Sequence, residues 1–221
     1  MKILIVLILV LFFAVAQFWG LKVAPADRDM GDVYRILFVH VPAAWNALLF
    51  FFLNFIACLV TLIKKDRAWD RLAHAAAEVG LTLTGLALML GSIWGRPTWG
   101  VWWTWDPRLT TTAILFILYS GYLILRKLIE DPEKRAKMTS GIGILLFLNV
   151  PIVYLSVRWW RTLHQVQSSP STMDPNMVLA LRLNAFAFLG IALFFLVSRI
   201  RLAQKQASLE ESHSMPPAEG L

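Results

Sequence analysis

Cysteine and charge are both scarce in this chain of 221 residues. The one cysteine, Cys58, excludes a disulfide framework and a Cys-x-x-Cys redox pair. Only 16% of the residues are charged, whereas 58% are hydrophobic, and this balance excludes an ordinary soluble domain. The composition therefore indicates a protein that resides in a membrane.

Six apolar stretches are each long enough to cross a hydrocarbon layer about 30 Å thick. Because they are continuous rather than alternating, and unpaired backbone groups cannot be left in lipid, they predict an all-α integral membrane protein and not a β-barrel. We expect one six-helix transmembrane domain over residues 1–203 and a disordered cytoplasmic tail over 204–221, where the sequence turns polar. The stretches lie near residues 3–19, 36–63, 72–94, 109–125, 142–157 and 177–198.

The first stretch resembles a cleavable signal, because Ala24-Pro25-Ala26 follows it. Its length, and the bulky Phe18 and Trp19 before that site, favour its retention as the first span.

Basic residues are divided unevenly between the two sides of the membrane. Thirteen of the 21 fall at the N-terminus, in the 64–71 and 126–141 loops and in the tail, against seven in the other loops. The positive-inside rule therefore predicts that both termini are cytoplasmic. The net charge of +7 reflects this orientation and does not indicate a nucleic-acid partner. The outward loops are 20–35, 95–108 and 158–176.

Two Asp-Pro pairs precede apolar stretches, at Asp106-Pro107 and Asp174-Pro175. Each aspartate is expected to cap a helix that begins at the proline.

Half of the ten tryptophans lie within residues 94–105, in the outward loop between spans three and four. Tryptophan favours the headgroup region, but five residues exceed what anchoring needs. If residues 98–106 are helical, four of their side chains form one stripe, an apolar shelf with a polar edge that suits a flat macrocycle. The tryptophans are Trp94, Trp99, Trp102, Trp103 and Trp105, and the stripe is Trp99, Trp102, Trp103 and Asp106.

Gly95 and Gly100 lie in the same run. They would permit a close approach of the backbone to a ligand, although a simple turn explains them almost as well.

Two histidines are predicted at the same outer boundary. His40 opens the second span, and His164 follows the fifth. Neutral imidazoles on opposite faces of a porphyrin complete six-coordinate iron, so the pair is a candidate haem site. His74 and His213 belong to the cytoplasmic side and are interpreted as structural or solvated.

Haem carries two propionates, which need cations at the rim of an apolar pocket. Arg35 and Arg108 are the best candidates in sequence, ahead of other outer arginines. Arg182, inside the sixth span, pairs with Glu78 or faces the pocket, and the sequence leaves both options open. The other arginines are Arg96, Arg158 and Arg161.

These segments resemble the CcmC family, the haem exporter C proteins of system I cytochrome c maturation. The run that ends Trp103-Thr104-Trp105-Asp106 resembles the WWD signature of the wider haem-handling superfamily. Two further strings, at 40–45 and 158–165, narrow the resemblance to CcmC, and it covers nearly the whole chain.

The resemblance implies that His40 and His164 are the axial ligands of a transiently bound haem b and that the Trp94–Asp106 loop holds the macrocycle. It implies a location in the bacterial inner membrane and a haem-lyase-like delivery role without side-chain catalysis. The implied partners are the haem chaperone CcmE, the small CcmD and the ABC-transporter subunits CcmA and CcmB.

Two other functions remain open. A b-type cytochrome subunit would normally bury its histidines at depth on facing helices, whereas His40 and His164 are expected at the boundary. A haem transporter or channel would need polar residues along a path through the spans, and few are available. Those few are Asn54, Glu78, Asn149, Arg182 and Asn184.

Overall fold

The computed structural model describes residues 2–164 and 173–214, and over these residues the chain is helical, with one isolated β-bridge between Asp27 and Gly31. The prediction of six spans is confirmed, because six stretches are long and apolar enough to cross a membrane. They are Lys2–Val23, Asp32–Lys64, Arg67–Trp99, Pro107–Leu128, Pro132–Trp159 and Pro175–Leu209.

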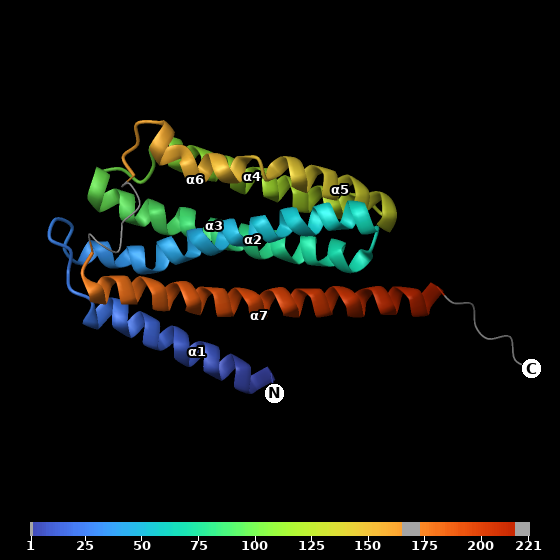
Figure 1. Ribbon diagram of the computed structural model, residues 1–221, viewed down its shortest axis with the longest axis horizontal. Coiled ribbons are helices and arrows are strands. Elements are labelled where there is room, and N and C mark those ends of the chain that lie inside the picture. Colours follow the sequence, from blue (N-terminus) through green and yellow to red (C-terminus); the bar gives the residue numbers. More distant parts are fainter. Residues whose placement is uncertain (1, 165–172, 215–221) are drawn as a thin grey trace, which may run out of the picture.

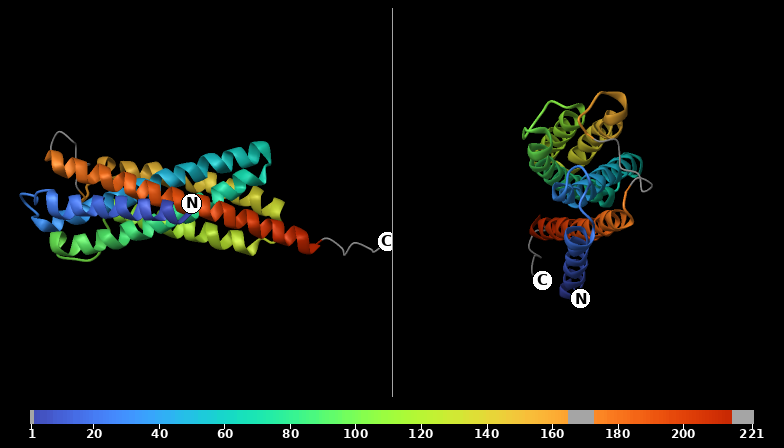
Figure 2. Two further views of the ribbon diagram at one scale, coloured as in Figure 1. Left: turned by 90° about the horizontal axis from the view of Figure 1, so that it is seen from below. Right: turned by 90° about the vertical axis from the view of Figure 1, so that its left-hand side faces the viewer.

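The helices form layers that run along one common direction (Figures 1 and 2). The long helices α2 and α3 lie in the middle, with α7 on one side of them and α4, α5 and α6 on the other; α1 packs outside, against α7. The bounds are α1 Lys2–Phe18, α2 Leu37–Lys64, α3 Arg67–Trp99, α4 Pro107–Leu128, α5 Pro132–Leu146, α6 Asn149–Trp159 and α7 Pro175–Ser214, with a π-helical turn η1 Trp19–Val23 and a 3-10 turn η2 Asp32–Ile36.

Small residues allow α2 and α3 to pack closely. Ala75, Ala76 and Ala87 of α3 are buried in the core that α2 and α7 share with it. A Cβ added at Gly80 would lie 2.8 Å from the ring of Phe51, closer than real contacts allow. Such small residues let helix backbones approach in a membrane, where association depends on packing and not on the hydrophobic effect.

The helix ends follow local sequence. Asp106 accepts a hydrogen bond from the backbone N–H of Arg108, and Asp174 accepts one from Asn176, so both predicted Asp-Pro caps are confirmed. The fifth span is broken between α5 and α6. Pro151 explains the break, because it has no N–H to donate to the carbonyl of Phe147.

The C-terminal helix is longer than expected. We predicted a disordered tail from residue 204, but α7 continues as helix to Ser214. Residues 204–214 are polar yet rich in good helix formers such as Gln, Lys, Ala and Glu, and this propensity explains the difference. Residues 215–221 lie outside the described part of the chain.

Polar side chains inside the bundle bond to neighbouring helices. Asn54 Nδ2 donates to the carbonyl of Ala73, and Asn184 Nδ2 donates to that of Ala16. Asn149 Nδ2 donates to the carbonyl of Thr111. These residues therefore join helices together and do not line a polar path.

Neither of the two options for Arg182 is found, and its pairing with Glu78 is the first that fails. Glu78 binds Arg199 through two hydrogen bonds, of 2.6 and 2.7 Å, and lies 3.6 Å from His74. Arg182 is exposed on α7 and does not line the cavity described below, so the second option fails as well. The sequence placed Arg182 and Glu78 only by their depth in the membrane. The way α7 packs against α3 brings Arg199 to Glu78 instead.

The cytoplasmic end of the bundle contains a buried ion pair. Arg126 of α4 donates to both carboxylate oxygens of Asp70 on α3, at 2.7 and 2.8 Å, and to the hydroxyl of Thr139 on α5, at 2.6 Å. The arginine and aspartate side chains are 6% and 9% exposed. Three helices are thus tied together at one point.

We predict that Arg126→Leu lowers the free energy of unfolding by about 3–5 kcal/mol, because it leaves the Asp70 carboxylate buried without its counter-charge. The double variant Asp70→Leu/Arg126→Leu removes both charges and should be closer to the parent. Thermal unfolding in detergent compares the three proteins. A double variant that is at least as unstable as the single would contradict this interpretation.

Candidate functional site

A cavity of about 170 Å³ lies between α2, α3, α4 and α6, toward the end of the bundle that carries the predicted outer loops. It exceeds the space that one water molecule needs, about 10–15 Å³, by roughly tenfold. Its wall is mostly apolar, with a few polar groups, the pattern of a small-molecule site. The lining residues used below are His40, Trp45, Gly91, Trp94, Arg108 and His164.

His40 is held rigidly on α2. Its Nδ1 lies 3.0 Å from the carbonyl oxygen of Ala87, one turn before Gly91 on α3. A carbonyl can only accept, so Nδ1 carries the proton and the neutral ring keeps its lone pair on Nε2. Gly91 leaves room for the ring, since a Cβ there would be 3.2 Å from His40 Cε1. Metal-binding histidines commonly donate their other N–H to a backbone carbonyl in this way.

His164 reaches the same cavity from the loop after α6. Its ring centre lies 5.2 Å from that of Trp99 and 6.3 Å from that of Trp94. Its Nδ1 is buried without a hydrogen bond. The pKa of His164 is lowered to about 4, mainly by burial and to a smaller extent by His40 and Arg108, while Asp106 acts in the opposite direction. The imidazole is therefore neutral near pH 7, which is the form that binds a metal.

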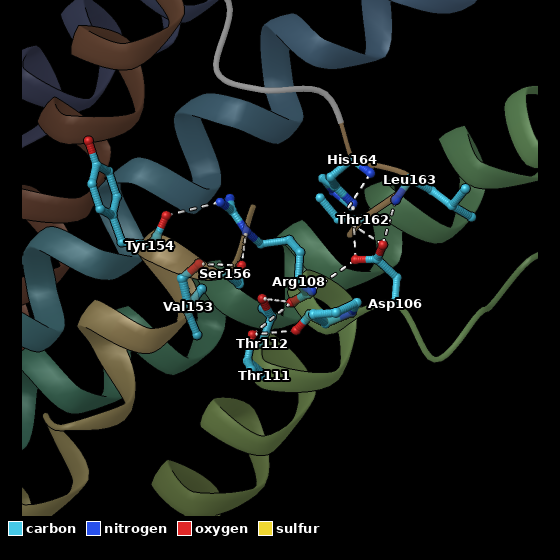
Figure 3. A network of polar contacts seen from close by, with 11 residues as sticks. Asp106, Arg108, Thr111, Thr112, Val153, Tyr154, Ser156, Thr162, Leu163 and His164 are labelled. Carbon is cyan, nitrogen blue, oxygen red and sulfur yellow. Dashed lines mark hydrogen bonds and ion pairs between the residues drawn. The ribbon is translucent and has the colours of Figure 1, made fainter. Parts of the chain in front are cut away.

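Asp106 connects the two outer loops beside this cavity (Figure 3). Its Oδ2 accepts from the hydroxyl of Thr162, at 2.6 Å, and from the backbone N–H of Leu163, at 2.7 Å. Its Oδ1 accepts from the N–H of Arg108, at 2.8 Å. Burial acts to raise the pKa of Asp106, but these hydrogen bonds outweigh it and the pKa lies below its ordinary value. The carboxylate is therefore charged.

Arg108 is the one arginine of the predicted set that lines the cavity. Its Nε donates to Ser156 Oγ, at 2.8 Å, and its Nη2 to the carbonyl of Tyr154, at 3.2 Å (Figure 3). Nη1 has no hydrogen bond within the described residues, so the guanidinium is held in place and keeps a donor available.

Arg35 lies away from the cavity. It binds the carbonyls of Gly20 and Ala24, at 2.7 and 2.8 Å, and Asp32 at 2.8 Å. Its position five residues before His40 suggested a contact with the pocket, but these partners hold it to the loop beside η1. The other outer arginines, Arg96, Arg158 and Arg161, are exposed and do not line the cavity.

The expected tryptophan stripe does not form. Helix α3 ends at Trp99, and Gly100 has a left-handed backbone with φ of 78°, so residues 100–106 are irregular and the single face is lost. Trp94 is buried in the cavity wall, with Trp99 packed against it at 5.2 Å. Trp103 contacts Trp105 at 6.0 Å. Trp102 and Trp105 are 59% and 81% exposed.

The two glycines of the run have different roles. Gly100 makes the turn that ends α3, as one of the two interpretations predicted. Gly95 allows a close approach, but to protein groups: a Cβ there would lie 3.1 Å from the ring of Trp99 and 3.3 Å from the carbonyl of Val101.

Sequence reasoning missed several residues that shape the site. Gly91 makes room for His40, and Trp45 lines the cavity while remaining 45% exposed. Thr162 and Ser156 hold Asp106 and Arg108 in place. Trp45 and Thr162 lie in the two strings that carried the family resemblance, whereas nothing in the sequence distinguishes Gly91 from other helical glycines.

Comparison with known proteins identifies the family. The family model described as "Heme exporter protein C" matches residues 1–214. The chain belongs to the CcmC family. It is a multi-pass protein of the bacterial inner membrane, as its six spans and bacterial relatives indicate.

Three relatives illustrate the range of the family. Heme exporter protein C of Bradyrhizobium diazoefficiens is 40% identical over 169 residues, which cover 75% of this chain and 64% of that protein. The Escherichia coli K12 protein of the same name is 36% identical over 194 residues, 87% of this chain and 79% of the relative. A "Putative cytochrome c biosynthesis ccmC-like mitochondrial protein" of Marchantia polymorpha is 39% identical over 155 residues, 70% of this chain and 65% of the relative.

We predict that Gly91→Ala disturbs the position of His40, because the new methyl group would lie 3.2 Å from Cε1 and the ring, which is bonded to the carbonyl of Ala87, must shift to make room. The variant should weaken haem binding about tenfold or more, the typical cost of losing a partner of a metal ligand. Haem titration followed by absorbance measures the change.

Gly85→Ala is the matched control. It lies on the same helix, and its Cβ would lie 3.1 Å from the ring of Phe116, away from the cavity. Equal affinity in both variants would refute a role for Gly91 in placing His40.

Proposed function

We propose that this protein binds haem b at the outer face of the inner membrane and presents it to the haem chaperone CcmE during cytochrome c maturation. The axial ligands are His40 and His164. The observation that carries the proposal is that two histidines distant in sequence line one apolar cavity, beside a buried tryptophan and an arginine.

The side chains at the cavity could complete the coordination of a metal that already has most of its ligands from a cofactor. Among the residues described, no group of three or more His, Cys, Asp and Glu side chains could hold a bare metal ion. A porphyrin supplies four nitrogens, so two imidazoles complete the coordination of its iron. His40 offers Nε2 because its Nδ1 is engaged, and His164 is neutral.

The remaining groups suit the rest of the macrocycle. Trp94 and the aliphatic wall contact the ring, and the free Nη1 of Arg108 can bind one propionate. Arg35 has no part in this arrangement. His40 and His164 would fill both iron positions, which would suppress oxygen chemistry while the haem awaits transfer to the chaperone. The protein then acts by presentation, as a haem-lyase-like component without a catalytic side chain of its own.

The proposed partners are those that the family resemblance implies. The CcmA and CcmB subunits of the ABC transporter and the small CcmD are proposed as neighbours in the membrane. The exposed Trp102 and Trp105 lie on the loop that faces the chaperone in this proposal.

The competing functions have less support. A b-type cytochrome normally places its haem ligands on facing helices, whereas His164 lies on a loop beyond α6. A channel needs polar groups along the bundle, and Asn54, Asn149 and Asn184 are bonded to backbone carbonyls instead.

We predict that His40→Ala/His164→Ala abolishes the bis-histidine absorption spectrum of the purified haem complex, because both axial ligands are removed. His74→Ala is the control, since His74 lies toward the other end of α3 beside Glu78. An unchanged spectrum in the double variant would end the ligand assignment.

We also predict that haem accumulates on the protein when CcmE is absent and declines when CcmE is co-expressed, because a delivered haem leaves its carrier. Absorption spectra of the protein purified from the two backgrounds measure its haem content. Equal content in both would identify a permanent cofactor and favour the cytochrome alternative.

A further inference from the structure

One buried ring nitrogen at the cavity has no hydrogen bond, although a possible acceptor lies close to it. His164 Nδ1 has no hydrogen bond, and Asp106 Oδ1 is 3.8 Å away. That oxygen accepts one bond, from Arg108, and so retains acceptor capacity. The Asp106 side chain is 2% exposed, so water competes little for it.

The same carboxylate fixes the backbone on which His164 sits. Through Oδ2 it holds the hydroxyl of Thr162 and the N–H of Leu163, the two residues before His164. The Thr162 hydroxyl in turn accepts from the N–H of His164, at 3.0 Å. Asp106 therefore controls both the path of the loop and the surroundings of the ring (Figure 3).

Ligation decides which nitrogen carries the proton. If His164 binds iron through Nε2, the neutral ring must have its proton on Nδ1, which then faces the Asp106 carboxylate. Closing 3.8 Å to an ordinary hydrogen-bond length takes a movement of about 1 Å. The result is a carboxylate–histidine–metal triad, an arrangement that orients the ligand and raises its basicity.

We propose that Asp106 is a positioning residue for His164: it anchors the loop through Thr162 and Leu163, and it accepts a hydrogen bond from His164 Nδ1 when Nε2 binds the haem iron. This inference rests on the proposed function. It assigns the aspartate of the tryptophan-rich run to the histidine and not to the haem.

The two axial ligands would then be unlike. His40 donates its Nδ1 proton to the neutral carbonyl of Ala87, whereas His164 would donate to an anion. The histidine bonded to the carboxylate becomes the more electron-rich ligand and favours ferric iron.

The test compares Asp106→Asn with Asp174→Asn in the full-length haem complex. Asparagine keeps the size and the capping ability of aspartate but removes the charge. Asp174 is the matched control, because it is the other Asp-Pro cap and bonds to the N–H of Asn176. Haem dissociation and the reduction midpoint, by redox titration followed by absorbance, are the two readouts.

Asp106→Asn should release haem about 10–100-fold faster and raise the reduction midpoint, while Asp174→Asn matches the parent in both. The proposal is overturned if Asp106→Asn keeps the parent midpoint and dissociation rate, or if Asp174→Asn shifts them equally.

Thr162→Val provides a second variant in case Asp106→Asn does not fold. It removes the hydroxyl that joins Asp106 to the N–H of His164 and leaves the carboxylate intact. Faster hydrogen exchange of residues 158–164 in the haem-free protein, together with faster haem release, is expected. Parent-like values for both would refute the anchoring role.

These results separate the inference from the proposed function. If His40→Ala/His164→Ala loses the bis-histidine spectrum while the Asp106 and Thr162 variants behave as the parent, only the positioning role fails. If the histidine variant keeps the spectrum, the ligand assignment itself fails.

Discussion

Hydrocarbon offers no hydrogen-bond partner, so a polar side chain inside the bundle is stabilised where a neighbouring helix supplies one. The buried asparagines bond to the backbone of a neighbouring helix: Asn54 joins α2 to α3, and Asn184 joins α7 to α1. At the cavity the protein leaves two buried nitrogens, Trp94 Nε1 and His164 Nδ1, without a hydrogen bond. An unsatisfied buried donor costs about 1–3 kcal/mol, so these groups suit a site that rearranges when it is occupied: in our proposal Asp106 becomes the partner of His164 Nδ1 when haem binds.

That both histidines lie at the same end of the bundle could be predicted from the sequence, because it depends only on the number of spans and on which loops lie at each end. Neither the number of spans nor the order of the loops changes when a helix boundary is misplaced by a few residues. His40 and His164 consequently reach one cavity, as the sequence indicated. The Asp106 and Asp174 caps were equally predictable, because capping acts over two or three residues.

Side-chain partners could not be predicted in the same way, since they depend on the rotation of one helix against another. Arg35 is close to His40 in sequence, yet it binds carbonyls of Gly20 and Ala24, which the irregular chain around η1 leaves without helical partners. The predicted tryptophan stripe does not form because α3 ends at Gly100. Beyond this residue the chain is not helical, so the helical repeat no longer decides which side chains share a face. Gly91 is a residue that the sequence did not single out. Its role is visible only in the structure, where the ring of His40 packs against it.

The two ends of the bundle are built differently, and this contrast bears on how haem could reach the site. Toward the cytoplasm, Asp70, Arg126 and Thr139 tie α3, α4 and α5 together. Phe51 of α2 and Tyr119 of α4 are both buried, and their rings stack at a centroid distance of 3.9 Å. A rigid macrocycle that passed between α3, α4 and α5 at this point would have to break that buried ion pair. Toward the outside, α2 and α6 both contribute to the cavity wall, and Trp45 and Tyr154, one from each helix, line it and remain 45% and 43% exposed. The packing therefore opposes a conduit along the bundle axis, and in our proposal the outer half is the part of the protein that admits haem.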